Sequence, residues 1–189
     1  MTSRPSSLVA ISGPVCAGKS SLAAGLAGAV GARILTTRLL ISNHLGRAPV
    51  ELTRGELQRA GEELDEERGG AWVAERVAGL SHESVCLVVV DAVRNAQQLA
   101  ALRAEAVTVH VHLAADPNVL AARYAARRMA SPDLEFPGFE ELRANPTEAQ
   151  VEGLSDLADL TIDTSRTDPD ESLAHVLRCL DQGEARPLV

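Results

Sequence analysis

The chain has 189 residues, of which 46% are hydrophobic and 23% charged, so it can fold as one domain (1–189) around a core and is too apolar to be disordered. Its net charge of −8 argues against a dedicated nucleic-acid-binding protein, and it contains no run of about 18 apolar residues that would span a membrane. Three cysteines without CxxC spacing indicate neither a disulfide framework nor a zinc site. We therefore expect a cytoplasmic protein with no nucleic-acid or membrane partner.

Short apolar runs alternate with stretches of helical periodicity along the whole chain. The runs that predict strands cover residues 8–11, 32–35, 85–90, 107–113 and 160–162. The stretches that predict helices include residues 20–30, 54–67 and 117–129. This alternation is typical of an α/β fold with a parallel sheet of five strands and helices on both faces.

Residues 131–146 break this rhythm with three prolines and four acidic residues. The segment predicts an exposed loop or short lid, and a plain surface connection is the alternative.

Residues 13–20 read Gly-Pro-Val-Cys-Ala-Gly-Lys-Ser, a full match to the phosphate-binding pattern GxxxxGK[ST]. The motif follows a predicted strand and opens a predicted helix, which is the context that it requires. Gly13 and Gly18 provide backbone freedom for a loop whose N–H groups face phosphate oxygens. Lys19 is expected to reach the β- and γ-phosphates of ATP, and the Ser20 hydroxyl to bind Mg²⁺.

Lys19 is also the single lysine among 18 basic residues. Arginine has a broad planar head and lysine a compact one on a thin stem, so position 19 requires the compact cation. The guanine-binding motif Asn-Lys-x-Asp needs a second lysine, and this excludes the standard GTP switches.

Asp91 ends the apolar run 85–90, and Arg94 follows it closely. An acidic residue at the carboxyl end of a buried strand is the Walker B arrangement, which holds Mg²⁺. The alternative is an aspartate that caps the next helix. Arg94 is expected at the edge of the sheet where ligands bind in open α/β folds.

His110 and His112 alternate on one predicted strand. Without a third ligand nearby, we interpret them as packed strand residues and not as a metal pair.

Together these segments resemble the P-loop nucleoside monophosphate kinase superfamily, over residues 8 to about 165. The resemblance is carried by GPVCAGKSSLA, LTTRLLISNHL, TRGELQRAGEELDEERGGAWV, VVVDAVRNAQQLAALR and VHVHLAADPNVLAARYAARR. Within the superfamily, deoxynucleoside monophosphate kinases and dephospho-CoA-kinase-like proteins are the most similar. The resemblance implies a three-layer P-loop kinase fold, with an acceptor-binding helical insertion at about 37–80 and a lid region at about 123–146.

The resemblance also implies a role for each group of site residues. Those expected to hold ATP are Gly13, Val15, Cys16, Ala17, Gly18, Lys19, Ser20 and Ser21, with Arg123 and Arg127 closing over the transferred group. Those expected to bind the acceptor are Arg38, Gln58, Glu62, Asp65, Arg94 and Arg128. The residues expected to act in catalysis are Lys19, Asp91, Arg123 and Arg127. For the arginines and for Gln58, Glu62 and Asp65, a solvated helix face is the alternative.

We therefore expect a kinase that moves the γ-phosphoryl group of Mg·ATP to a (deoxy)nucleoside monophosphate, with a homodimer left open. A phosphate acceptor needs no general base. If the acceptor is instead a hydroxyl of a nucleoside or another metabolite, including a dephospho-CoA-like one, Asp91 is the candidate base. The other alternative is an ATP-binding accessory protein without catalysis. The sequence does not identify the acceptor.

Overall fold

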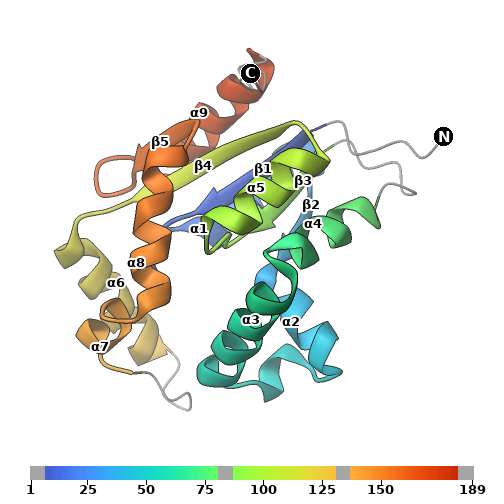
Figure 1. Ribbon diagram of the computed structural model, residues 1–189. Coiled ribbons are helices and arrows are strands. Elements are labelled where there is room, and N and C mark those ends of the chain that lie inside the picture. The colour runs from blue at the N-terminus through green and yellow to red at the C-terminus, as the bar shows by residue number, and fades with distance from the viewer. Residues whose placement is uncertain (1–6, 81–86, 131–136, 183–189) are drawn as a thin grey trace.

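The computed structural model describes residues 7–80, 87–130 and 137–182 (Figure 1). Its centre is a five-stranded sheet in the order β2-β3-β1-β4-β5, in which every pair is parallel. The strands are β1 (Ser7–Ser12), β2 (Arg33–Thr36), β3 (Leu87–Asp91), β4 (Thr108–Ala114) and β5 (Leu160–Asp163). β1 lies in the middle, where Val9 is in register with Val89 of β3 and Val109 of β4.

The α-helices cover both faces of this sheet. They are α1 (Lys19–Val30), α2 (Thr37–Leu45), α3 (Arg54–Arg68), α4 (Ala71–Ala78), α5 (Ala96–Glu105), α6 (Pro117–Ala130), α7 (Phe139–Arg143), α8 (Pro146–Gly153) and α9 (Pro169–Asp181). Two short 3-10 helices, η1 (Pro49–Glu51) and η2 (Leu154–Leu157), lie between them. The predicted α/β fold, with a parallel sheet between layers of helices, is confirmed.

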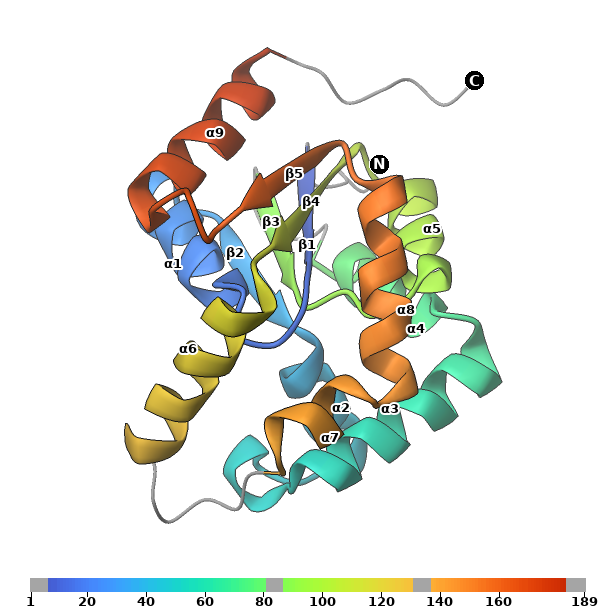
Figure 2. The same cartoon turned by 90° about the vertical axis from the view of Figure 1, so that its left-hand side faces the viewer.

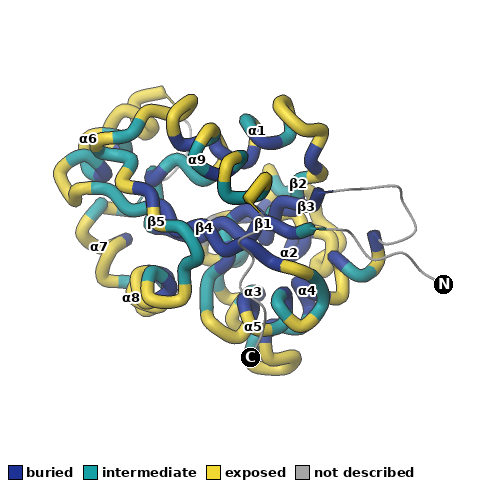
Figure 3. The backbone as a smooth tube through the Cα atoms, turned by 90° about the horizontal axis from the view of Figure 1, so that it is seen from above, coloured by how far each residue is buried: buried dark blue, intermediate teal, exposed yellow. Residues whose placement is uncertain are grey.

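Alternation of side chains along the strands divides the core into two layers. Val9 and Ile11 of β1 face α1 and α9, where they pack with residues such as Leu26. Leu8 and Ala10 face the opposite layer, which contains α4 and α5. Figure 2 shows α1 and α9 on one side of the strands and α4, α5 and α8 on the other. Figure 3 shows the central strands as the buried interior of the molecule.

The segment that follows α6 differs from the prediction. Residues 131–136 lie outside the described part of the chain, but Phe139–Arg143 forms α7 and Pro146 begins α8. The side chain of Asn145 caps α8 by accepting a hydrogen bond from the N–H of Thr147 at 2.9 Å. The prediction of a loop was therefore wrong for residues 139–143. The start of α8 follows from the sequence, because a capping asparagine followed by a proline at the first helical position starts a helix. The first residues of the predicted 85–90 strand also lie outside the described part, and β3 begins at Leu87.

Within the described ranges, no helix is long and apolar enough to cross a membrane.

Candidate functional site

The phosphate-binding motif forms the turn between β1 and α1, beside the point where the order of the strands reverses. The crevice outside such a reversal is where open α/β sheets bind ligands. Both predicted glycines have positive φ angles, +137° at Gly13 and +96° at Gly18. A Cβ at Gly13 would lie 2.3 Å from the carbonyl oxygen of Leu113, so only glycine fits against β4 there. Cys16 has a φ of +63°, which is strained for a residue with a side chain.

Lys19, the first residue of α1, folds back over the loop. Its Nζ donates hydrogen bonds to the carbonyl oxygens of Gly13 and Pro14, both at 2.6 Å. Burial of the ammonium group, assisted by the positive charge of Arg94, lowers the pKa of Lys19 to about 8. The lysine therefore lies in the loop where a phosphate would compensate its desolvated charge.

Ser20 and Asp91 meet at the foot of the loop, as the sequence predicts. The Ser20 hydroxyl donates to Oδ2 of Asp91 at 2.9 Å. Asp91 is only 5% exposed, and its Oδ1 is buried without a hydrogen-bond partner in the described part of the chain. A hydroxyl beside a carboxylate with an unsatisfied oxygen is a donor set that suits Mg²⁺, which prefers oxygen ligands.

A cavity of about 200 Å³ lies between α8 and the two helices α2 and α3. Its lining includes Glu148, which also bonds to the N–H of Val15 in the loop. Five of the six predicted acceptor residues line it, namely Arg38, Gln58, Glu62, Asp65 and Arg94. They come from α2, α3 and the turn after β3, so the fold brings together residues that are far apart in the sequence. The sixth, Arg128, is exposed on α6 and does not line this cavity.

Within the cavity wall, Asp65 is the centre of a hydrogen-bond cluster. Its oxygens accept from the indole N–H of Trp72 at 2.7 Å, from the Asn95 amide at 2.6 Å and from the Gln98 amide at 3.0 Å. These bonds join α3, α4 and α5. The carboxylate oxygens of Asp65, which an acceptor would need, are therefore already bonded to side chains of the cavity wall.

Gln58 and Glu62 join α3 to α8 in a similar way. Gln58 and Asn145 exchange amide hydrogen bonds of 3.1 and 2.8 Å. Glu62 accepts from Gln58 at 2.9 Å and from the Thr147 hydroxyl at 3.3 Å. Arg38 donates to the carbonyl oxygen of Pro49 at 2.7 Å. Binding of an acceptor by these groups stays a prediction.

Glu148 of α8 is the residue that connects the cavity to the loop. It is 4% exposed. One carboxylate oxygen accepts from the Val15 N–H at 3.3 Å and the other pairs with the Arg94 guanidinium at 3.4 Å. Glu148 was not identified from the sequence, because no element was predicted between Pro146 and the strand at 160–162. The Asn145-Pro146 pair, which marks the start of a helix, was the available signal.

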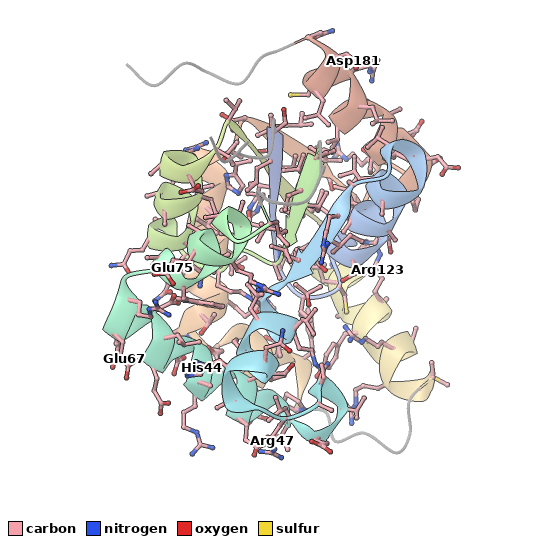
Figure 4. The ribbon with its side chains drawn as sticks, turned by 90° about the vertical axis from the view of Figure 1, so that its right-hand side faces the viewer. His44, Arg47, Glu67, Glu75, Arg123 and Asp181 are labelled. Carbon is pink, nitrogen blue, oxygen red and sulfur yellow. The ribbon has the colours of Figure 1, made fainter. Side chains whose placement is uncertain are left out.

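A second cavity, of about 260 Å³, lies on the other side of the loop and is bordered by Arg123 of α6. Arg123 donates to the carbonyl oxygen of Thr164 at 2.7 Å and to that of Cys16 at 3.3 Å. Cys16, Ala17, Gly18 and Ser21 line this cavity together with residues after β5. Figure 4 shows Arg123 where α6 approaches α1.

Arg127, one turn further along α6, is exposed and lines neither of the two cavities. The structure therefore places Arg123 beside the loop and does not bring Arg127 or Arg128 to it. A lid role for Arg127 stays a prediction.

His110 and His112 lie buried under the loop, joined by the Ser12 hydroxyl. A carbonyl oxygen only accepts, so Nδ1 of His110 donates to Leu157 at 3.1 Å. Nε2 of a neutral His110 then accepts from Ser12 at 2.7 Å, and Ser12 accepts from Nδ1 of His112 at 2.9 Å. Burial, together with the positive charge of Lys19, lowers the pKa of His112 to about 4. No metal-binding group of three or more His, Cys, Asp or Glu residues occurs in the described ranges.

Several solved structures with a similar arrangement of strands and helices are described as kinases. The chain is similar to a sugar kinase from Janibacter sp. HTCC2649 (18% identity, 94% of this chain and 95% of that chain, TM-score 0.57). It is also similar to a shikimate kinase from Acinetobacter baumannii (18%, 98% and 97%, 0.57). A gluconokinase from Sinorhizobium meliloti 1021 gives comparable values (20%, 95% and 94%, 0.57). No model of a known protein family and no curated protein matches the sequence.

The chain thus has the fold of P-loop kinases, with a phosphate-binding loop that lines one cavity and is joined to another through Glu148. At 16–20% identity, these similarities establish the fold and do not identify the acceptor.

Proposed function

We propose that this protein is an ATP-dependent kinase that transfers the γ-phosphoryl group to a hydroxyl of a small polar metabolite. The observation that carries the proposal is Glu148, a buried carboxylate in the wall between the phosphate-binding loop and the adjoining cavity. A phosphate acceptor would bring two negative charges against this carboxylate, which costs energy at low dielectric. A hydroxyl acceptor carries no such charge and can donate a hydrogen bond to it.

The loop supplies the means to bind and orient the phosphates of ATP. Its N–H groups and the start of α1 attract the anion, and Lys19 leaves the carbonyl oxygens of Gly13 and Pro14 to pair with it. Ser20 and Asp91 would hold Mg²⁺, which neutralises charge on the phosphates when bound. Phosphoryl transfer depends mostly on such positioning and charge neutralisation.

The second cavity is the proposed site for the rest of the nucleotide. It is lined by Cys16, Ala17 and Gly18 of the loop and not by Glu148. Arg123 borders it, and its guanidinium plane can stack on a base. In this proposal Arg123 contributes to ATP binding, and its hydrogen bonds to Thr164 hold it in position.

The composition of the first cavity favours a compact acceptor with several hydroxyl groups. At about 200 Å³ it is small for a ligand site. Its polar lining includes amides and threonines, which hydrogen-bond neutral groups. The kinases of similar fold are described as acting on sugars, shikimate and gluconate, and this supports the same acceptor class.

A nucleoside monophosphate, which the sequence analysis expects as the acceptor, is the second candidate here. The observation in its favour is that both Arg38 and Arg94 line the cavity, since guanidinium groups bind phosphate well. Arg94 already pairs with Glu148, however, and this leaves less positive charge for a phosphate.

An assay of ADP release from Mg·ATP tests the proposal, with glucose, gluconate, shikimate, nucleosides and nucleoside monophosphates as acceptors. Mass spectrometry of the products shows whether a hydroxyl or a phosphate was modified. Lys19→Ala is the control for transfer by this loop. We expect a hydroxyl acceptor to raise ADP release well above the acceptor-free rate and to gain one phosphoryl group.

Formation of nucleoside diphosphates alone would favour the second candidate. ATP binding without transfer to any acceptor in the panel would contradict the proposed kinase activity and support an accessory protein.

A further inference from the structure

Three carboxylates line the cavity of about 200 Å³ that we propose to bind the acceptor, called the acceptor cavity below, and they differ in what they contact. Both oxygens of Asp65 accept from donors of the wall. Glu62 is exposed and accepts from Gln58 and Thr147. Only Glu148 among these three reaches the phosphate-binding loop, through the N–H of Val15. It alone lies where an acceptor atom in the cavity could meet a phosphoryl group held by the loop.

Asp91, which the sequence offers as the base for a hydroxyl acceptor, lies elsewhere. Its Oδ2 is bonded to Ser20 at the foot of the loop, and it does not line the acceptor cavity. Its buried and unsatisfied Oδ1 suits a metal ligand. Removal of a proton from an acceptor in the cavity therefore requires a different group.

We propose that Glu148 is the general base of the reaction, an inference that rests on the proposed transfer to a hydroxyl. The acceptor oxygen forms a bond to the γ-phosphorus, while the bond from that phosphorus to the β–γ bridging oxygen breaks and its electron pair leaves with ADP. The hydroxyl proton moves to a carboxylate oxygen of Glu148. Arg94, paired with the other oxygen at 3.4 Å, keeps the carboxylate aimed between the cavity and the loop.

A carboxylate bonded to a loop N–H could instead act as a plug that mimics phosphate and blocks ATP. The contacts favour the base. Lys19, which would pair with a bound phosphate, donates hydrogen bonds to two carbonyl oxygens of the loop at 2.6 Å. The contacts of Glu148 with Val15 and Arg94 are long, at 3.3 and 3.4 Å. Such long contacts are weaker than those expected of a carboxylate that replaces a phosphate in the loop.

The test is Glu148→Gln, whose amide oxygen still accepts from Val15 but cannot take a proton. With the hydroxyl acceptor that the wild type phosphorylates, we expect kcat to fall by about 10²–10³, in the range for loss of a general base. The Kd of ATP, measured by calorimetry, should change by less than about threefold because the loop is intact. Glu152→Gln, on the exposed side of α8, is the matched control and should behave as wild type.

Loss of a buried charge partner destabilises some variants, so Glu148→Ala is assayed in parallel with added formate. Recovery of kcat with rising formate is expected, because the small carboxylate replaces the missing base. A Glu148→Gln protein with near-native kcat, or a Glu148→Ala protein that formate does not improve, overturns the assignment while transfer by the wild type still stands. Tighter ATP binding and faster turnover in Glu148→Gln would identify a plug. If the wild type modifies no hydroxyl, the proposed function fails first and the base with it.

Discussion

Asp65→Ala tests whether this carboxylate holds the wall of the acceptor cavity together. The substitution removes the acceptor of three donor groups, the Trp72 indole N–H and the amides of Asn95 and Gln98. Trp72 is 7% exposed and Gln98 is 1% exposed, so water replaces the lost oxygens poorly. A hydrogen bond to a charged group contributes about 1.5–3 kcal/mol, and some of the donors will find water in the cavity.

We expect Asp65→Ala to lower the free energy of unfolding by about 3–5 kcal/mol, a large part of the total for a domain. Urea unfolding followed by fluorescence measures this directly, because Trp72 is the only tryptophan of the chain and contacts Asp65. Glu62→Ala is the matched control on the same helix. Glu62 is exposed, and we expect a loss below about 1 kcal/mol.

A loss below about 1 kcal/mol in Asp65→Ala would refute the bracing role. It would return Asp65 to the role that the sequence first predicts, contact with the acceptor. In that case the acceptor KM should rise while the urea midpoint stays unchanged.

Three further predictions concern the loop and the packing around it. With the pKa of Lys19 at about 8, kcat/KM for ATP should fall about tenfold per pH unit above that value, and a flat profile to pH 9.5 would contradict the desolvated lysine. Folding lowers the pKa of His112 from 6.5 to about 4. Between pH 6.5 and pH 4, therefore, the imidazole of His112 takes up a proton in the unfolded chain but not in the folded one. The free energy of unfolding should thus drop by about 3 kcal/mol as the pH falls across this window, and His112→Gln should weaken the dependence in urea titrations. Gly70→Ala should lower Tm strongly, because φ at Gly70 is +80° and the added Cβ would lie 2.5 Å from the backbone nitrogen of Gln98. In the control Gly28→Ala, the added Cβ lies in open space on α1, and Tm should stay the same or rise.

The strands and the phosphate-binding loop could be predicted because their signals are local. Strands buried on both faces are continuous apolar runs, and the loop is a contiguous motif with glycines at positive φ. The meeting of Ser20 and Asp91 also followed from the sequence, since parallel strands end at one edge of the sheet.

The grouping of residues around the first cavity could be predicted only in part, because its walls come from segments far apart in the chain. Periodicity placed Gln58, Glu62 and Asp65 on one face of a helix but could not show that their polar atoms bond to Asn145, Thr147 and Trp72. It also could not show which arginines of α6 turn toward the loop. Arg123 bonds to the loop and Arg127 is exposed, although the two are four positions apart and share a helix face.

The charge balance beside the loop limits which acceptors the cavity can take. Its lining carries three carboxylates and two guanidinium groups. Arg94 is already paired with Glu148, and Arg38 bonds to a backbone carbonyl oxygen. A dianionic acceptor would have to draw both arginines away from these partners and still approach Glu148. A neutral or singly charged acceptor avoids this cost and gains hydrogen bonds from the surrounding amides. Selectivity in this site would thus come from the arrangement of carboxylates as much as from any group that attracts the acceptor.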